Sequence, residues 1–359
     1  MRLKRFARAA AGCVLFLLLT LLVGKALDFA LTDDVHSYSR IMLEELYASE
    51  GTVDTLFLGS SHSYRSFDPE LADALLGVHS FNAGSSQQMP DGSYHMLVEA
   101  GESNPLRTVY LECFFAGYIQ QKSSNVPLAC YLLTDYMRPS ANKYSYLLEM
   151  GGLAALADDF LPARHSIASP EELPGLWRAK LTDAYEPGNY RYVTYPGEEE
   201  YRGRGFVYTC GTPPYGFDAI ASIDEAQPVS EFGQEYLNKI TGYCVDNGIR
   251  LVLVTAPLPS QFAANTQGYQ AYVDWMAAYA RQNGLEYWDF TLYKDADALN
   301  LSSEDFQDAH HLNGQGAGKF TTVFCGVATR SGAGQDVSGE FYTTVEEKLA
   351  LAPDGTYTG

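Results

Sequence analysis

Two polar clusters in this chain contain the residue types of a nucleophile and its base. In the first, residues 56–63 (LFLGSSHS), a short apolar run ends at Gly59 and is followed by two serines and a histidine. The second, Asp308-Ala-His-His311-Leu-Asn313, lies near the other end of the chain. A serine beside a histidine that is oriented by an aspartate can attack a carbonyl group, because the histidine takes the hydroxyl proton. We therefore predict that Ser61, His311 and Asp308 come together.

The first cluster follows a predicted strand. Residues 53–58 (VDTLFL) are apolar and too few for a surface helix, so they predict a buried strand. In an open parallel sheet, chemistry takes place at the carboxyl edge, where this strand would present its serine. The alternative is an ordinary polar turn between a strand and a helix.

The second cluster also has alternatives. It suits an exposed polar loop, and His310, His311 and Asp308 together offer zinc-type ligands. Because the sequence contains no other clear cluster of metal ligands, we predict neither a metal nor a cofactor.

Gly84 follows the next predicted strand, residues 78–83, in the sequence Asn82-Ala-Gly84-Ser-Ser. A glycine at a strand end lets a backbone N–H point into a site, as an oxyanion hole requires. We predict oxyanion donors at the N–H groups of Ser61 and Gly84, although 82–86 also suits a plain turn. Other residues that we expect to line the site are Ser60, His62, Asn82, Glu112 and His310.

The remaining pattern alternates strands with helices. Further strands are predicted over 107–115, 249–257 and 285–290, and helices over 67–77, 94–100, 236–247 and 269–284. Such alternation predicts an α/β fold with a parallel sheet of about five strands and helices on both faces. The stretch 120–230 lacks this alternation, is rich in Tyr, Pro and Gly, and is too long for a loop. We interpret it as an insertion, in the manner of a lid or a substrate-binding elaboration.

The amino terminus predicts a membrane anchor. Residues 1–8 carry four positive charges and no negative ones, and an uncharged apolar run follows over 9–24. At 1.5 Å per residue this run spans roughly 24 Å, and basic residues before it predict a cytoplasmic amino terminus. A cleaved signal peptide is the alternative, but the small residues around Lys25 make a poor cleavage site. We expect a single-pass plasma-membrane protein with its main domain outside the cytoplasm.

Charge and cysteine content exclude several classes. The formal net charge is −20 despite the basic amino terminus, which argues against nucleic acid or anionic membrane patches as partners. The six cysteines include one in the apolar run and show no metal-type spacing. They do not form the framework of a disulfide-rich protein, although their number allows one or two disulfides that the sequence does not assign.

Taken in order, these pieces resemble the SGNH (GDSL-type) hydrolase superfamily. Gly59-Ser60-Ser61 matches the first block, Gly84 the oxyanion glycine of the second, and Asp308 and His311 the final Asp-x-x-His. The continuation His311-Leu-Asn313 with Gly316 is similar to the membrane-anchored branch, which includes the D-alanine transfer protein of lipoteichoic acid synthesis and alginate O-acetylation proteins. The third block, Gly-x-Asn-Asp, is absent, because the third strand ends in Leu-Glu-Cys.

The resemblance implies a three-layer α/β sandwich of SGNH/flavodoxin-like type and acyl chemistry through Ser61. It implies an esterase or O-acyltransferase acting on an acylated glycan or cell-wall polymer, with a membrane-bound O-acyltransferase as a partner. A non-catalytic glycan-binding scaffold that retains the fold is the alternative, and a metal-dependent hydrolase is a third. The domain boundaries we expect are 1–8 (cytoplasmic), 9–27 (anchor), 28–50 (juxtamembrane helix), 51–326 (catalytic domain with its insertion) and 327–359 (tail).

Overall fold

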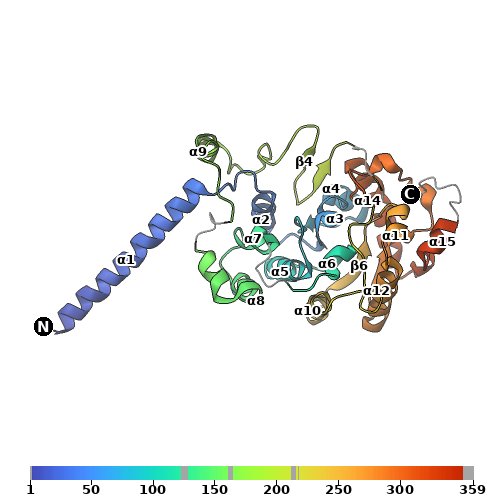
Figure 1. The fold of residues 1–359 in the computed structure, drawn as a ribbon, viewed down its shortest axis with the longest axis horizontal. Coiled ribbons are helices and arrows are strands. Elements are labelled where there is room, and N and C mark those ends of the chain that lie inside the picture. The colour runs from blue at the N-terminus through green and yellow to red at the C-terminus, as the bar shows by residue number, and fades with distance from the viewer. Residues whose placement is uncertain (1, 123–127, 161–164, 212–215, 217, 351–359) are drawn as a thin grey trace.

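The computed structural model describes residues 2–122, 128–160, 165–211, 216 and 218–350. Helix α1 (Arg2–Leu31) projects away from the rest of the chain (Figure 1), and its apolar side chains are exposed. Within the described residues it is the one helix long and apolar enough to cross a membrane. This agrees with the predicted apolar helix at 9–27.

The predicted juxtamembrane helix over 28–50 is wrong in extent. Its first residues belong to α1, and a break separates them from α2 (Tyr38–Ala48). The side chain of Ser37 caps α2 by accepting a hydrogen bond from the N–H of Arg40. Such a cap starts a new helix, because it satisfies a backbone donor that has no partner within the helix.

A parallel five-stranded sheet forms the centre of the molecule. Its strands are β1 (Thr55–Leu58), β2 (Ser80–Asn82), β3 (Thr108–Glu112), β6 (Arg250–Thr255) and β7 (Glu286–Asp289). The order is β2-β1-β3-β6-β7, and every neighbouring pair is parallel. The prediction of an α/β fold with a parallel sheet of about five strands is confirmed.

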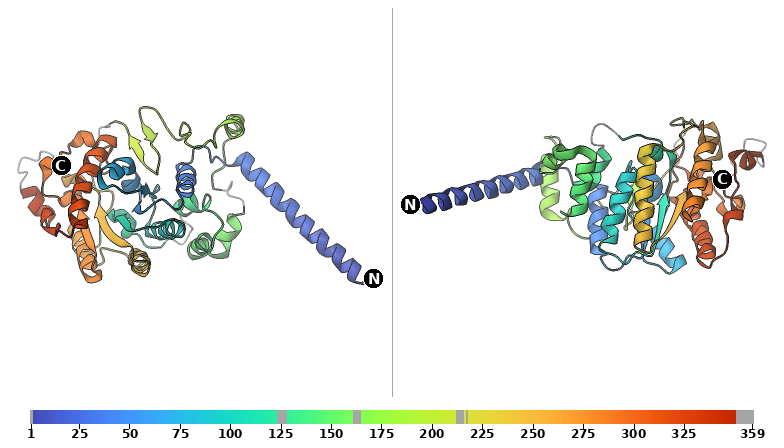
Figure 2. Two further views of the ribbon diagram at one scale, coloured as in Figure 1. Left: turned by 180° about the vertical axis from the view of Figure 1, so that it is seen from behind. Right: turned by 90° about the horizontal axis from the view of Figure 1, so that it is seen from below.

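Helices pack against both faces of this sheet. Neighbouring strand residues point to opposite faces, so Leu56 and Leu58 join one apolar cluster and Phe57 joins another. The first cluster includes residues of α2, α5 (Pro90–Gly101), α10 (Glu231–Asp246) and α12 (Tyr269–Asn283), which lie side by side in Figure 2 (right). The second includes residues of α4 (Pro69–Leu76) and α14 (Gly314–Gly332).

Several short helical elements lie between or after the longer ones. They are α3 (Ser61–Tyr64), α6 (Phe115–Tyr118), α11 (Ser260–Asn265), η2 (Phe290–Leu292), α13 (Ala296–Leu299), η3 (Ser303–Asp305), η4 (Ser338–Glu340) and α15 (Val345–Ala350). The end of the predicted tail, 351–359, lies outside the described residues. All six cysteines are free.

The region predicted as an insertion contains both helices and a β-ribbon. Its described elements are α7 (Leu128–Thr134), α8 (Ala141–Asp158), α9 (Leu173–Thr182), β4 (Glu199–Tyr201) and β5 (Val207–Thr209). Strands β4 and β5 pair antiparallel in a sheet of their own. The ribbon is therefore not part of the main sheet, and it contacts the turn after β1 through Arg65.

Candidate active site

The turn after β1 depends on Gly59. Its φ is 140°, and a Cβ there would lie 2.8 Å from Cβ of Glu112 on the adjacent strand. Only glycine fits a backbone of this shape at so close an approach. The chain then enters α3, which is capped by the side chain of Ser60 through the N–H of His62. This geometry places Ser61 at the carboxyl edge of β1.

Asp308 holds His311 in a fixed orientation. Its Oδ1 accepts the backbone N–H groups of His310, at 3.0 Å, and of His311, at 2.8 Å. Its Oδ2 lies 2.8 Å from Nδ1 of His311. Because an ionised carboxylate only accepts, Nδ1 carries the ring proton and Nε2 is left as an acceptor.

Nε2 of His311 meets the serine. It lies 2.7 Å from Oγ of Ser61, whose hydroxyl donates to it. The structure thus connects Ser61, His311 and Asp308 by hydrogen bonds, although Ser61 and the other two residues lie far apart in the sequence. The arrangement is that of a nucleophile, a general base and an orienting carboxylate.

Hydrogen bonds and the charge of His311 keep the Asp308 carboxylate ionised in spite of its burial. Burial raises the pKa of Asp308. The hydrogen bond to His311, the charge of His311 and the backbone N–H of His310 together lower it by more, so the pKa lies well below its usual range. The His311 side chain is 16% exposed, so the base is accessible from one side. Asp308 therefore stays charged and can stabilise a positively charged imidazole.

Two further histidines stack beside this row. The His62 ring lies 3.6 Å from that of Phe114 and 4.3 Å from that of His311, measured between centroids. Burial lowers the pKa of His62 and that of His310, the latter to about 4, and the charge of His311 lowers both further. Both rings are therefore neutral near pH 7.

These neutral rings could hold a metal ion. Nitrogen atoms of His62, His310 and His311 lie within 4.8 Å of one another. The metal ligands suggested by the sequence were His310, His311 and Asp308. In the structure His62 takes the place of Asp308, whose carboxylate is hydrogen-bonded to His311. Imidazoles backed by a carboxylate are typical of transition-metal ligands.

A cavity of about 360 Å³ opens over Ser61. Of the predicted site residues, Ser60, Ser61, His62, His310 and His311 line it. Residues not predicted from the sequence also line it, namely Gln87, Gln88, Met89, Phe114, Ala116, Gly117, Gln120, Leu128 and Ala129. Several of these follow β2 or β3, so the rule that sites gather at strand ends could have found them.

The structure contradicts the prediction of Gly84 as an oxyanion donor. Its N–H donates to Oδ1 of Asn82 at 3.1 Å, and Gly84 does not line the cavity. A Cβ at this position would lie 3.0 Å from the carbonyl oxygens of Gly59 and Ser60, so close packing is what requires glycine. The N–H of Ser61 remains, because the first residue of a helix has no acceptor within that helix.

Asn82 and Glu112 do not line the cavity either. Asn82 is fully buried and clamps the turn: its amide donates to the carbonyls of Ser63 and Phe67, and its oxygen accepts from Oγ of Ser63. Glu112 lies beneath Gly59, where burial raises the pKa of its carboxyl group and the backbone N–H groups of Phe114 and Ala256 lower it by less. Burial raises its pKa to about 8. Both residues support the turn instead of facing a substrate.

Arg65 connects the site to the β4–β5 ribbon. It forms an ion pair with Glu199 on β4, donates to Oγ1 of Thr209 on β5 at 3.2 Å, and also donates to Gln307, which precedes Asp308. One side chain thus joins the serine turn, the ribbon and the loop of the base. No motif in the sequence indicated this role.

A model of an uncharacterised protein family matches residues 218–329, which include Asp308 and His311 but not Ser61. No curated protein matches the chain.

Proposed function

We propose that this protein is a serine acyl-ester hydrolase or O-acyltransferase that acts outside the cytoplasm on acyl groups of cell-surface polysaccharides or teichoic-acid-type polymers. The observation that carries the proposal is the row Ser61–His311–Asp308, with 2.7 Å and 2.8 Å between the hydrogen-bonded atoms. The reaction would proceed through an acyl-Ser61 intermediate.

In the first half-reaction, Nε2 of His311 takes the Ser61 hydroxyl proton as Oγ attacks the ester carbonyl carbon. The carbonyl oxygen becomes an oxyanion, and His311 then gives its proton to the departing alcohol oxygen as the ester C–O bond breaks. In the second half-reaction, the oxygen of water or of a glycan hydroxyl attacks the carbonyl carbon of acyl-Ser61, and the bond between that carbon and Oγ of Ser61 breaks. The proton of the attacking hydroxyl passes through His311 back to Oγ of Ser61.

Two groups would stabilise the oxyanion. One is the N–H of Ser61; a donor of this kind contributes about 3–4 kcal/mol in other hydrolases. In place of Gly84 we propose the side-chain amide of Gln87, which lines the cavity. The neighbouring Gln88 is less available, because its amide nitrogen donates to Ser93 at 3.1 Å and its oxygen accepts from Ser85.

The proposed location follows from α1. Positive charges before an apolar span favour a cytoplasmic amino terminus, which would place the sheet domain outside the plasma membrane. We further propose that the sheet and its two sets of helices form the three-layer sandwich of SGNH-type enzymes. A membrane-bound O-acyltransferase that supplies the acyl group would be the expected partner.

Labelling with a serine-reactive fluorophosphonate probe tests the proposal. The full chain in detergent micelles is treated with the probe, and the labelled residue is mapped by mass spectrometry. We expect label on Ser61, lost in Ser61→Ala and in His311→Ala and retained in Ser60→Ala. A folded protein without label would favour the non-catalytic glycan-binding scaffold.

A metal-dependent hydrolase is the second candidate, supported by the three clustered imidazoles. The two mechanisms make opposite predictions for a chelator and for His310→Ala. A serine mechanism leaves ester hydrolysis unchanged by EDTA, and His310→Ala is far milder than His311→Ala. Equal losses in both histidine variants, together with EDTA inhibition, would establish the metal mechanism.

A further inference from the structure

A second cavity, of about 460 Å³, lies next to the one over Ser61. Leu128 lines both cavities, and consecutive residues of one loop divide between them, with Ser86 in the second and Gln87 in the first. Tyr38 ties this loop to the wall of the second cavity by donating to the carbonyl oxygen of Gly84 at 2.9 Å. The two cavities are therefore adjacent.

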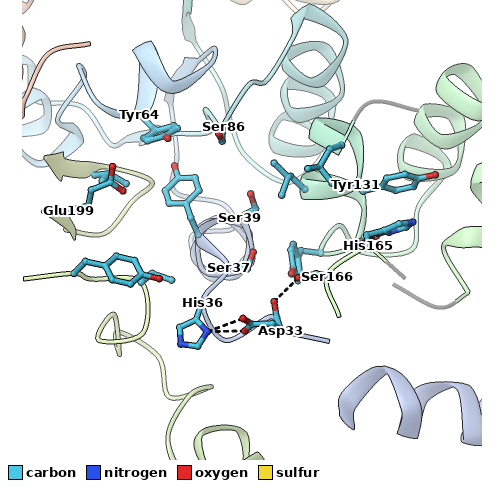
Figure 3. Close-up of a pocket in the computed structure, with 18 residues that line it drawn as sticks. Asp33, His36, Ser37, Ser39, Tyr64, Ser86, Tyr131, His165, Ser166 and Glu199 are labelled. Atoms are coloured by element: carbon cyan, nitrogen blue, oxygen red, sulfur yellow. Dashed lines mark hydrogen bonds and ion pairs between the residues drawn. The ribbon is translucent and has the colours of Figure 1, made fainter. Parts of the chain in front are cut away.

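The second cavity is built from distant segments around the start of α2 (Figure 3). Glu199 of the ribbon lies on one side of it, and Tyr131 and His165 lie on the other. Asp33 lies two residues beyond the end of α1. If α1 spans a membrane, this cavity is on the membrane-proximal side of the domain.

Its walls combine aromatic rings with paired charges. Five tyrosines contribute to the lining: Tyr38, Tyr64, Tyr131, Tyr136 and Tyr195. Each lining carboxylate already has a partner: Asp33 contacts His36, Asp135 contacts His165, and Glu199 contacts Arg65. No lysine or arginine is among the described lining residues, so the cavity offers no unpaired cation to an anionic ligand.

One polar pair is largely buried. The side chain of Asp135 is 7% exposed and that of His165 is 11% exposed, with 3.1 Å between Oδ2 and Nδ1. The His165 ring stacks on Tyr131 at 3.5 Å between centroids. Because His165 covers one face of Tyr131, the most exposed tyrosine in the lining is Tyr195, at 48%. An exposed aromatic ring near carboxylate and imidazole groups matches a sugar, whose hydroxyls form hydrogen bonds at its edge while its C–H faces pack on rings.

We propose that the second cavity binds an uncharged sugar residue of a glycan. Combined with the proposed acyl chemistry, on which this part of the inference rests, the bound sugar belongs to the acceptor polymer. A neighbouring sugar of the same chain then extends past Ser86 and Leu128 toward Ser61. The cavity provides the affinity and direction that the smaller cavity over Ser61 does not.

Oligosaccharide binding tests this site. Maltotetraose, cellotetraose and chitotetraose are titrated into the full-length Ser61→Ala protein in detergent micelles, with poly(glycerol phosphate) as the anionic comparison. Calorimetry gives Kd, and the inactive background removes any turnover. Tyr195, which lines the cavity and is 48% exposed, is the position to change, with Tyr144 on α8, 41% exposed, as the matched control.

We expect at least one neutral oligosaccharide to bind, Tyr195→Ala to weaken it about fivefold or more, and Tyr195→Phe and Tyr144→Ala to leave it within twofold. Absence of saturable binding, equal binding by Tyr195→Ala, or tighter binding of poly(glycerol phosphate) would overturn the inference. If Tyr195-dependent binding occurs but the fluorophosphonate probe labels no serine, the site stands and the proposed acyl chemistry fails. If the probe labels Ser61 but no oligosaccharide binds, the acyl chemistry is supported and the sugar site is ruled out.

Discussion

Two Asp-x-x-His segments of this chain form the same local pair but have different surroundings. In 33–36, Nδ1 of His36 lies 2.9 Å from Oδ1 of Asp33. In 308–311, Nδ1 of His311 lies 2.8 Å from Oδ2 of Asp308. The His36 side chain is 48% exposed, whereas that of His311 is 16% exposed. The spacing alone therefore produces an oriented imidazole at both places.

The difference between them is the partner of the second ring nitrogen. Nε2 of His311 meets Oγ of Ser61, because the loop that follows η3 lies at the carboxyl edge of the sheet beside the end of β1. The pair at 33–36 lies between α1 and α2, at the rim of the second cavity. The Asp-x-x-His motif orients the imidazole ring. The fold determines whether a hydroxyl group, such as that of Ser61, lies next to the second ring nitrogen.

Replacing each aspartate by asparagine should separate the two pairs most strongly. Asp308→Asn removes the charge that orients and stabilises the His311 imidazole, and we expect hydrolysis of 4-nitrophenyl acetate to fall by roughly 10³–10⁴-fold in kcat/KM. Asp33→Asn, the matched control, should change it less than twofold. Comparable losses of kcat/KM in the two variants would contradict the conclusion that only the pair next to Ser61 takes part in ester hydrolysis.

A methyl group at Gly59 should break the turn that supplies the serine. Gly59→Ala places Cβ 2.8 Å from Cβ of Glu112 and strains a φ of 140°, so we expect a loss of about 3 kcal/mol in the free energy of unfolding, together with reduced activity. Gly51 also has a positive φ, 79°, but open space around its Cα. Gly51→Ala should cost about 1 kcal/mol, measured by urea denaturation, with activity unchanged.

Glu112 should make the stability of this turn depend on pH. Its pKa is raised from 4.5 to about 8 in the folded protein, so between these values the folded state binds more protons than the unfolded state. Stability must then fall as pH rises, by about 2 kcal/mol between pH 6 and pH 8. Glu112→Gln should remove this slope, whereas Glu102→Gln on the exposed end of α5 should keep it. An unchanged slope in Glu112→Gln would show that another group causes it.

Much of the fold could be predicted because its signals are local. The helix predicted over 67–77 is α4, with Asp68 accepting from the N–H groups of Glu70 and Leu71, and with Gly77 in the left-handed region at φ 68°. The five apolar runs became five strands, all shorter than predicted: the run 78–83 gives only Ser80–Asn82, and 107–115 gives only Thr108–Glu112. Apolar runs between turn residues are typical of buried parallel strands.

The site could be predicted only in part, because its remaining features depend on tertiary contacts. Gly84 looked like a free backbone donor, and only the fold brings the Asn82 side chain onto its N–H. Arg65 meets the ribbon and the loop before Asp308 through contacts from distant segments. The second cavity likewise gathers residues from many segments, and no spacing in the sequence marks them as one site.

Trapping the acyl-enzyme tests the central claim most directly. The full chain in detergent micelles is mixed briefly with 4-nitrophenyl acetate, quenched in acid, digested, and analysed by fragmentation mass spectrometry. We predict an acetyl group on Ser61, absent when Asp308→Asn or His311→Ala is treated in the same way. An acetyl group on Ser60 or Ser63, or turnover without any acetylated serine, would contradict a mechanism in which His311 activates Ser61.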